Sequence, residues 1–205
     1  MSAAVSALQK ARAAYTPKLP KALRNGAAAK AITGEPTAAA GDVEKIKALF
    51  TENFGSPMVT FEAAAAAAAV SEFNAGVILS GGQAPGGHNV IAGLYDGLKS
   101  LNKNNKLYGF LKGPDGLVKN EYIELTDEII DAYRTTGGFD MIGSGRTKLG
   151  KVEQFEAGKK HCEALNIKAL VIVGGDDSNT NACLLAEYYK KTNAGTTNSL
   201  QPHGL

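Results

Sequence analysis

The sequence has few cysteines, no long apolar run and no excess charge of either sign. Its two cysteines, Cys162 and Cys183, lie in separate segments without a CxxC spacing. This pattern argues against a zinc site or a disulfide scaffold, and it fits a reducing compartment. The chain also has no run of about 18 apolar residues and no apolar signal segment at its N-terminus, so we expect a cytoplasmic protein that is not bound to a membrane.

Charge is balanced, with 22 basic and 20 acidic residues and a net charge of +2. Such a balance gives no broad footprint for nucleic acid or for a membrane surface. Any phosphate-binding site must therefore be built locally. The length of 205 residues and the hydrophobic content of 44% are those of one globular domain, alone or with an extension.

Residues 1–73 differ in composition from the rest of the chain and include an alanine run. Helical spacing of apolar residues predicts one short helix from Val5 to Tyr15, and Asp42 is placed to cap a second. The segment from Asn25 to Gly41 is expected to be loose. The alanines from Ala63 to Ala69 favour a helix by intrinsic preference, and a surface linker fits their low complexity equally well. We expect a helical, low-complexity extension without chemistry of its own.

Residues 74–192 alternate short apolar runs with segments of helical spacing. Strands are predicted over residues 76–79, 106–110, 122–125, 139–142 and 169–173. This alternation is typical of βαβ units, and it predicts an α/β domain around a parallel sheet. Residues 193–205 have no apolar period and form an atypical tail.

The loop from Ser80 to Asn89 places four glycines between a predicted strand and a predicted helix. Glycines let the backbone approach a ligand closely, and its N–H groups can then bind phosphate oxygens. The loop lacks the GK[ST] of a Walker A motif, and its pairs Gly81-Gly82 and Gly86-Gly87 are spaced wrongly for GxGxxG. A phosphate-binding loop and a tight turn without a ligand both fit.

Two further loops carry charge at the ends of predicted strands. In the segment from Gly143 to Arg146, the arginine matches phosphate geometry, although a surface arginine in a turn fits as well. In the segment from Gly174 to Asn181, Asp176 is suited to hold Mg²⁺ by one oxygen, with the metal bridging phosphates. Because the carboxyl ends of parallel strands meet at one edge, the three loops together predict a phosphoryl-transfer or nucleotide site.

Some nearby residues have purely structural explanations. Asp177 and Ser178 can each cap the helix that follows them. His88, His161 and His203 share no sequence pattern, and none is predicted to be catalytic. The expected chemistry therefore depends on the three loops acting together.

Four segments together resemble one known family: QKARAAYTPKLPKALR, GVILSGGQAPGGHNVIAGLYD, GGFDMIGSGR and LVIVGGDDSNTNACLLAE. They are similar to the N-terminal half of pyrophosphate-dependent phosphofructokinase of the long, plant β-subunit-like type, over nearly all of residues 5–191. The resemblance implies the three-layer, Rossmann-like parallel sheet of the phosphofructokinase N-terminal domain, with a helical N-terminal extension. It also implies Mg²⁺-dependent, reversible phosphoryl transfer from pyrophosphate to fructose 6-phosphate in glycolysis, by a homo-oligomer or hetero-oligomer.

The resemblance further implies a role for each site residue. Gly81 and Gly82 would bind pyrophosphate through backbone N–H groups, and Arg146 would neutralise its charge. Asp176 would hold Mg²⁺. Asp177 stands where ATP-using relatives carry glycine, and its carboxylate would exclude the α-phosphate of ATP. Two other residues are expected to contact pyrophosphate, Gly175 and Ser178.

After Lys191 the sequence departs from the family's pattern. The family continues with a strand and a Pro-Lys-Thr-Ile-Asp-Gly-Asp motif that supplies the catalytic base, and residues 193–205 contain neither. We therefore expect a truncated chain that is inactive alone, with the catalytic base lying beyond Leu205. Two other functions stay open: an ATP-dependent phosphofructokinase or related kinase with a GGD loop, and a non-catalytic regulatory subunit.

Overall fold

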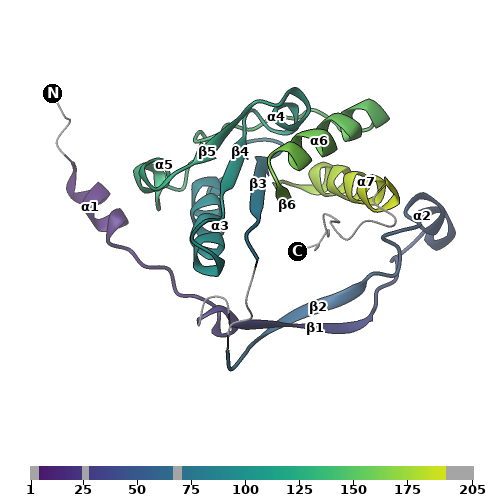
Figure 1. The fold of residues 1–205 in the computed structure, drawn as a ribbon, viewed down its shortest axis with the longest axis horizontal. Coiled ribbons are helices and arrows are strands. Elements are labelled where there is room, and N and C mark those ends of the chain that lie inside the picture. Colours follow the sequence, from purple (N-terminus) through teal and green to yellow (C-terminus); the bar gives the residue numbers. More distant parts are fainter. Residues whose placement is uncertain (1–4, 25–27, 67–70, 193–205) are drawn as a thin grey trace.

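The computed structural model describes residues 5–24, 28–66 and 71–192, which form an α/β sheet domain and a separate N-terminal extension (Figure 1). The sheet domain contains, in chain order, β3 (Asn74–Leu79), α3 (Gly87–Leu101), β4 (Leu107–Phe110), α4 (Pro114–Lys119), β5 (Tyr122–Leu125), α5 (Asp127–Tyr133), α6 (Val152–Ala164), β6 (Ile167–Val173) and α7 (Asp176–Thr192). The predicted alternation of strands and helices is confirmed.

The four strands are ordered β5-β4-β3-β6, with β3 parallel to both of its neighbours. β5 runs antiparallel to β4, so the expectation of a fully parallel sheet is wrong at this edge. The link between these two strands, residues 111–121, holds only the short helix α4. A parallel crossover usually needs a dozen residues or more, so a link of 11 residues lies at the lower limit and favours the antiparallel return.

Helices cover both faces of the sheet, which confirms the three layers (Figure 1). Side chains alternate along β3, as successive residues of a strand must. Val77 and Leu79 pack on the side of α3 and α5, whereas Ile78 packs on the side of α4, α6 and α7. All six residues of β3 are buried. The loop that begins at Ser80 is therefore anchored to the buried end of the central strand β3.

Residues 139–142 do not form the predicted strand. Residue 139 forms a bend and residues 140–142 form a turn, and the only sheet-like pairing in this region of the described chain is an isolated bridge between Ser80 and Gly145. The apolar side chains of the segment enter the core beside α3 and α5. Burial alone therefore explains its apolar character.

The N-terminal extension is only partly helical, which corrects the sequence prediction. Its elements are α1 (Ala7–Ala13), η1 (Lys21–Leu23), β1 (Ala29–Pro36), α2 (Val43–Leu49) and β2 (Pro57–Ala63). β1 and β2 pair antiparallel, from Ala29 opposite Ala63 to Pro36 opposite Pro57. The segment expected to be loose thus contains a strand, because its partner lies more than 20 residues away and no local pattern reveals the pairing.

Two finer expectations for the extension also change. Asp42 does precede α2, but its side chain caps no backbone N–H and instead pairs with Lys45 Nζ at 2.9 Å. Of the alanine run, Ala63 ends β2 and residues 64–66 are not helical, whereas 67–69 lie outside the described residues, as does the tail from 193 to 205. None of the described helices is both long and apolar enough to cross a bilayer.

Glu187 of α7 fastens the extension to the sheet domain. Its buried carboxylate accepts hydrogen bonds from Thr51 Oγ1 at 3.0 Å and from the backbone N–H groups of Glu52 at 2.9 Å and Asn53 at 3.1 Å. Lys191 Nζ lies 3.1 Å away. Burial raises the pKa of Glu187, but these hydrogen bonds outweigh it and hold the pKa below its usual value.

Candidate functional site

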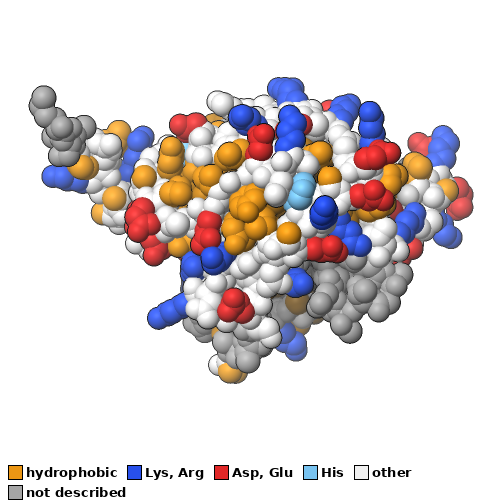
Figure 2. Space-filling view, turned by 45° about the horizontal axis from the view of Figure 1, so that its top comes forward, with side chains coloured by type: hydrophobic (Ala, Val, Ile, Leu, Met, Phe, Trp, Pro, Cys, Tyr) orange, Lys and Arg blue, Asp and Glu red, His pale blue; other side chains and the backbone are white. Residues whose placement is uncertain are grey.

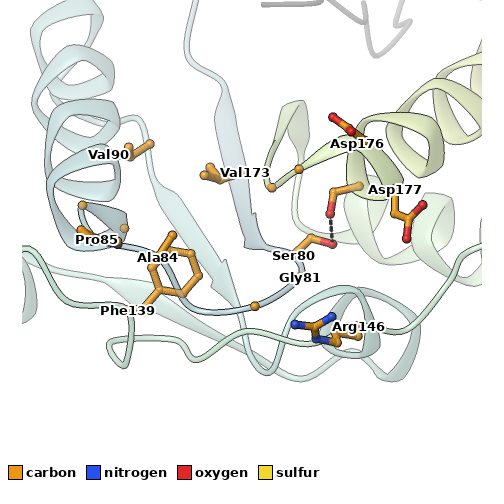
Figure 3. A pocket seen from close by; sticks show the side chains of 16 residues that line it. Ser80, Gly81, Ala84, Pro85, Val90, Phe139, Arg146, Val173, Asp176 and Asp177 are labelled. Carbon is orange, nitrogen blue, oxygen red and sulfur yellow. Dashed lines mark hydrogen bonds between the residues drawn. The ribbon is translucent and has the colours of Figure 1, made fainter.

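An open pocket of about 710 Å³ lies beyond the carboxyl ends of β3 and β6 (Figure 3). Its lining comes from the loop after β3, from Gly87 and Val90 of α3, from Phe139 and Arg146, and from residues 173–178. The prediction that the three loops meet at one edge of the sheet is therefore confirmed. All seven residues that the sequence singled out line this pocket: Gly81, Gly82, Arg146, Gly175, Asp176, Asp177 and Ser178.

The guanidinium of Arg146 lies directly over Gly82. A Cβ atom added at this glycine would stand 2.8 Å from Nη2 of Arg146, so the missing side chain is what leaves room for the cation beside the backbone. Arg146 is exposed to solvent on the pocket side. Arginine in such a position can bind phosphate oxygens with two parallel N–H groups.

Gly81 has a positive φ of +98°, a conformation that glycine adopts without strain. Its N–H donates to the carbonyl of Gly145 at 2.8 Å, beside the bond from Ser80 N to Val173 O at 2.7 Å. The Gly81 amide thus already has an acceptor. The expected contact of this N–H with pyrophosphate would require that bond to break.

Ser178 is buried, and its hydroxyl donates to Ser80 Oγ at 2.8 Å, as Figure 3 shows. This bond joins the end of β3 to the first turn of α7. Gly174 makes the close approach possible, because a Cβ there would collide with the Ser178 side chain and the Ser80 carbonyl. The hydroxyl of Ser178 therefore has a structural partner within the chain.

Asp176 and Asp177 are the first two residues of α7, and both are exposed. Their side chains point in different directions (Figure 3). Asp176 lines only the larger pocket, whereas Asp177 also lines a neighbouring pocket of about 200 Å³ that includes Thr147 and Lys148. The two carboxylates therefore share the larger pocket, and Asp177 alone also borders the smaller one.

The chemistry of the pocket fits a metal that arrives with phosphate. Within the described ranges, no cluster of three or more His, Cys, Asp or Glu side chains could hold a metal, and the only carboxylates that line the pocket are Asp176 and Asp177. Mg²⁺ keeps several waters and is commonly bound by one or two carboxylates together with phosphate oxygens. The start of α7 adds the partial positive charge of a helix N-terminus.

His88 is a residue that the sequence did not single out. It is 2% exposed and contacts the segment that leads to Arg146: the backbone N–H of Met141 donates to Nε2 at 3.0 Å, and Nδ1 lies 2.7 Å from Thr136 Oγ1. Burial lowers the pKa of His88, and the nearby Asp140 only partly opposes this shift. No sequence signal could have shown these partners, because they lie about 50 residues away in the chain.

The other two histidines add nothing to the pocket. His161 donates from Nδ1 to the carbonyl of Leu117 at 2.8 Å, which ties α6 to α4. His203 lies outside the described residues.

Comparison with known proteins gives a consistent result. The family model described as Phosphofructokinase matches residues 74–199. A pyrophosphate–fructose 6-phosphate 1-phosphotransferase of Porphyromonas gingivalis is 58% identical over 192 residues, which cover 94% of this chain and 35% of that protein. The beta subunit of the Solanum tuberosum enzyme of the same name is 44% identical over 197 residues, which cover 95% and 34%. The chain therefore spans about a third of the length of these relatives.

Solved structures agree with the fold. A pyrophosphate-dependent phosphofructokinase from Marinobacter aquaeolei matches with a TM-score of 0.51 and 25% identity, over 58% of this chain and 30% of that one. The phosphofructokinase from Saccharomyces cerevisiae matches with a TM-score of 0.51 and 27% identity, over 62% and 17%.

Proposed function

Because the chain belongs to the phosphofructokinase family, we propose that it carries the pyrophosphate half of a phosphoryl-transfer site. The whole reaction would be the Mg²⁺-dependent, reversible transfer of phosphate from pyrophosphate to fructose 6-phosphate, which gives fructose 1,6-bisphosphate in glycolysis. The names of the similar proteins from P. gingivalis and S. tuberosum support this choice of substrates.

Each pocket residue has a role in this proposal. Arg146 and the N–H of Gly82 bind pyrophosphate from one side, and the first turn of α7, at Gly175 and Ser178, binds it from the other. Asp176 holds Mg²⁺, which when bound neutralises phosphate charge. Ser178 binds pyrophosphate through its backbone, since its hydroxyl already donates a hydrogen bond to Ser80 Oγ. Gly81 sets the conformation of the loop and does not bind pyrophosphate through its N–H, because that N–H donates a hydrogen bond to Gly145 O.

The position of Asp177 is the observation that carries the choice of donor. This carboxylate borders both the larger pocket and the smaller one beside it. A nucleoside triphosphate would have to pass a third phosphate by this negative charge, whereas pyrophosphate ends before it. An ATP-dependent kinase is therefore the less favoured function.

Calorimetry on this chain tests the proposal. Pyrophosphate should bind when Mg²⁺ is present and only weakly when it is absent, and ATP with Mg²⁺ should bind more weakly than pyrophosphate. Tighter binding of ATP would contradict the assigned donor. Failure of both ligands to bind would favour a non-catalytic subunit instead.

The setting of the site is also part of the proposal. Four of the curated relatives are named as beta subunits and one as an alpha subunit, so we expect the complete protein to act as a homo-oligomer or hetero-oligomer. The balanced charge of the 205 residues gives no reason to expect that this part of the protein binds nucleic acid or a membrane. Cys162 and Cys183 are free thiols, which fits the cytoplasm.

A further inference from the structure

The first turn of α3 is bound to residues 136–141, here called the 136–141 loop. The backbone N–H of Gly86 donates to Gly137 O at 2.8 Å, and that of His88 donates to Gly138 O at 2.9 Å. In return, the N–H of Gly137 donates to Asn89 Oδ1 at 3.1 Å. These donors at the start of α3 are therefore used inside the chain, and they hold the near half of the loop.

The side chain of His88 holds the far half. A backbone N–H can only donate, so the Met141 N–H, 3.0 Å from Nε2, requires a lone pair on that nitrogen. Asp140 Oδ1 also lies 3.1 Å from Nε2, but this carboxylate is 77% exposed and water can satisfy it instead. Nδ1 then carries the proton and donates to Thr136 Oγ1 at 2.7 Å. The Thr136 hydroxyl in turn donates a hydrogen bond to Tyr133 O at 2.6 Å. The bonds to Met141 and Thr136 together fit a neutral imidazole with its proton on Nδ1.

The surroundings of this imidazole leave little freedom. The ring is 2% exposed and meets the ring of Tyr133 edge-on at 4.7 Å. A Cβ added at Gly138 would lie 2.7 Å from Cε1 of His88. Water therefore has little room to replace the two bonds, and losing either one leaves a buried polar group without a partner.

The 136–141 loop leads directly to the pocket. Phe139, within the loop, forms part of the pocket lining, and its ring packs against Gly87 of α3. Beyond the loop, the chain passes Gly145, whose carbonyl accepts the Gly81 N–H at 2.8 Å. It then reaches Arg146, whose guanidinium lies over Gly82. The position of the loop thus affects where two lining residues of the pocket lie, Phe139 and Arg146.

We propose that His88 is a positioning residue for the pyrophosphate site: through Nε2 it fixes the 136–141 loop and so sets Phe139 and Arg146. This inference rests on the proposed function. It assigns His88 no contact with the ligand, because its ring is enclosed by the loop and by Tyr133.

Two substitutions separate the two ring nitrogens. The terminal atoms of asparagine reach the position of Nδ1, and those of glutamine reach the position of Nε2. His88→Gln can therefore still accept the Met141 N–H, whereas His88→Asn can keep only the bond to Thr136. Each variant and the native chain would be compared in hydrogen–deuterium exchange of the Met141 amide and in calorimetric binding of pyrophosphate with Mg²⁺.

His88→Asn should speed exchange at Met141 and weaken pyrophosphate binding on the order of tenfold, the loss expected when a charged hydrogen bond is misdirected. His88→Gln should restore both values toward those of the native chain. A role limited to general stability would not give this difference, since both variants shorten or replace the same buried ring.

The outcomes are distinguishable. If the native chain does not bind pyrophosphate, the proposed function fails and this inference falls with it. If the native chain binds and His88→Asn binds equally well despite faster exchange at Met141, the inference alone is wrong. If His88→Asn does not fold, His88→Gln still tests the inference. Slow exchange at Met141 with pyrophosphate binding near that of the native chain would support it, whereas slow exchange with weakened binding would overturn it.

Discussion

Asp177 is the residue that we expect to discriminate most strongly between the two possible phosphate donors, pyrophosphate and ATP. Its carboxylate borders both pockets, so Asp177→Gly should remove both its charge and its bulk from the path of a third phosphate. We expect ATP to bind about tenfold more tightly to this variant, a size suited to one like-charge contact partly screened by solvent. Calorimetry with ATP and pyrophosphate, each with Mg²⁺, measures the change.

Asp177→Asn is the matched variant, because it keeps the volume of the side chain and removes the charge. If Asp177→Asn binds ATP more tightly than the native chain but less tightly than Asp177→Gly, both the charge and the volume of the Asp177 side chain weaken ATP binding. Unchanged ATP affinity in both variants would show that Asp177 does not select the donor.

Gly82 has a different task, which is to leave room for Arg146. Gly82→Ala places a Cβ 2.8 Å from the present position of Nη2, and the flexible arginine should move aside at little cost in stability. We expect pyrophosphate to bind about tenfold more weakly, since a bidentate contact is lost, while the free energy of unfolding changes by about 0.5 kcal/mol or less. Calorimetry and urea unfolding give the two values.

Gly97→Ala serves as the control for this substitution. It adds the same methyl group on the exposed side of α3, where a Cβ would meet nothing within 4 Å. Equal effects of the two variants on pyrophosphate binding would rule out the steric role of Gly82.

At the residue scale, the sequence predicted which loops line the pocket, because glycines and charges directly follow apolar runs, although the run at residues 139–142 is not a strand. It did not predict the hydrogen-bond partners. Ser178 donates to Ser80, Gly81 donates to Gly145, and His88 contacts Met141. Each bond joins segments far apart in the chain, and only the folded arrangement decides whether a polar group is left for a ligand.

At the scale of elements, β3, β6 and α7 were predictable because an apolar run ends in glycine before a helical pattern begins. The direction of β5 was not, since it depends on the length of the link from β4 rather than on the composition of the strand. The pairing of β1 with β2 was also hidden. Ile32 and Thr60 are good strand residues and are direct partners in the hairpin, but all of α2 lies between them in the sequence.

The contact between α7 and residues 51–53 depends on Glu187. Glu187→Gln should lower the free energy of unfolding at pH 7 by about 2 kcal/mol, because several hydrogen bonds to a buried charge are weakened at once. Faster amide exchange should appear at Glu52 and Asn53. Glu163→Gln, which changes an exposed carboxylate, is the control and should have little effect.

The same contact predicts a dependence on pH. The pKa of Glu187 in the folded chain lies below its usual value of 4.5, so its stabilising effect is complete above that value and is lost as the pH falls through the lowered pKa. The difference in unfolding free energy between the native chain and Glu187→Gln should therefore shrink on acidification. A constant difference from pH 7 to pH 3 would mean that the charge of Glu187 is not what matters.

On the scale of the whole molecule, the charges of the visible surface and those of the pocket can be compared. Acidic and basic side chains are interspersed across the face shown in Figure 2. The pocket, by contrast, sets one arginine against two carboxylates. These charges alone do not favour an anion such as pyrophosphate, and this is the physical reason to expect that its binding requires Mg²⁺.

The same set of side chains predicts that the chain binds the donor without turning it over. Apart from Arg146, the titratable groups among the described residues that line the pocket are Asp176 and Asp177, which the proposal assigns to Mg²⁺ and to the choice of donor. A general base must reach the hydroxyl of the sugar, and neither carboxylate is free for that task. We therefore expect no formation of fructose 1,6-bisphosphate above background from pyrophosphate and fructose 6-phosphate, under conditions in which calorimetry detects pyrophosphate binding. Turnover that disappears in Asp176→Asn would show that this chain holds a complete site, whereas turnover that persists in that variant would come from a contaminating enzyme.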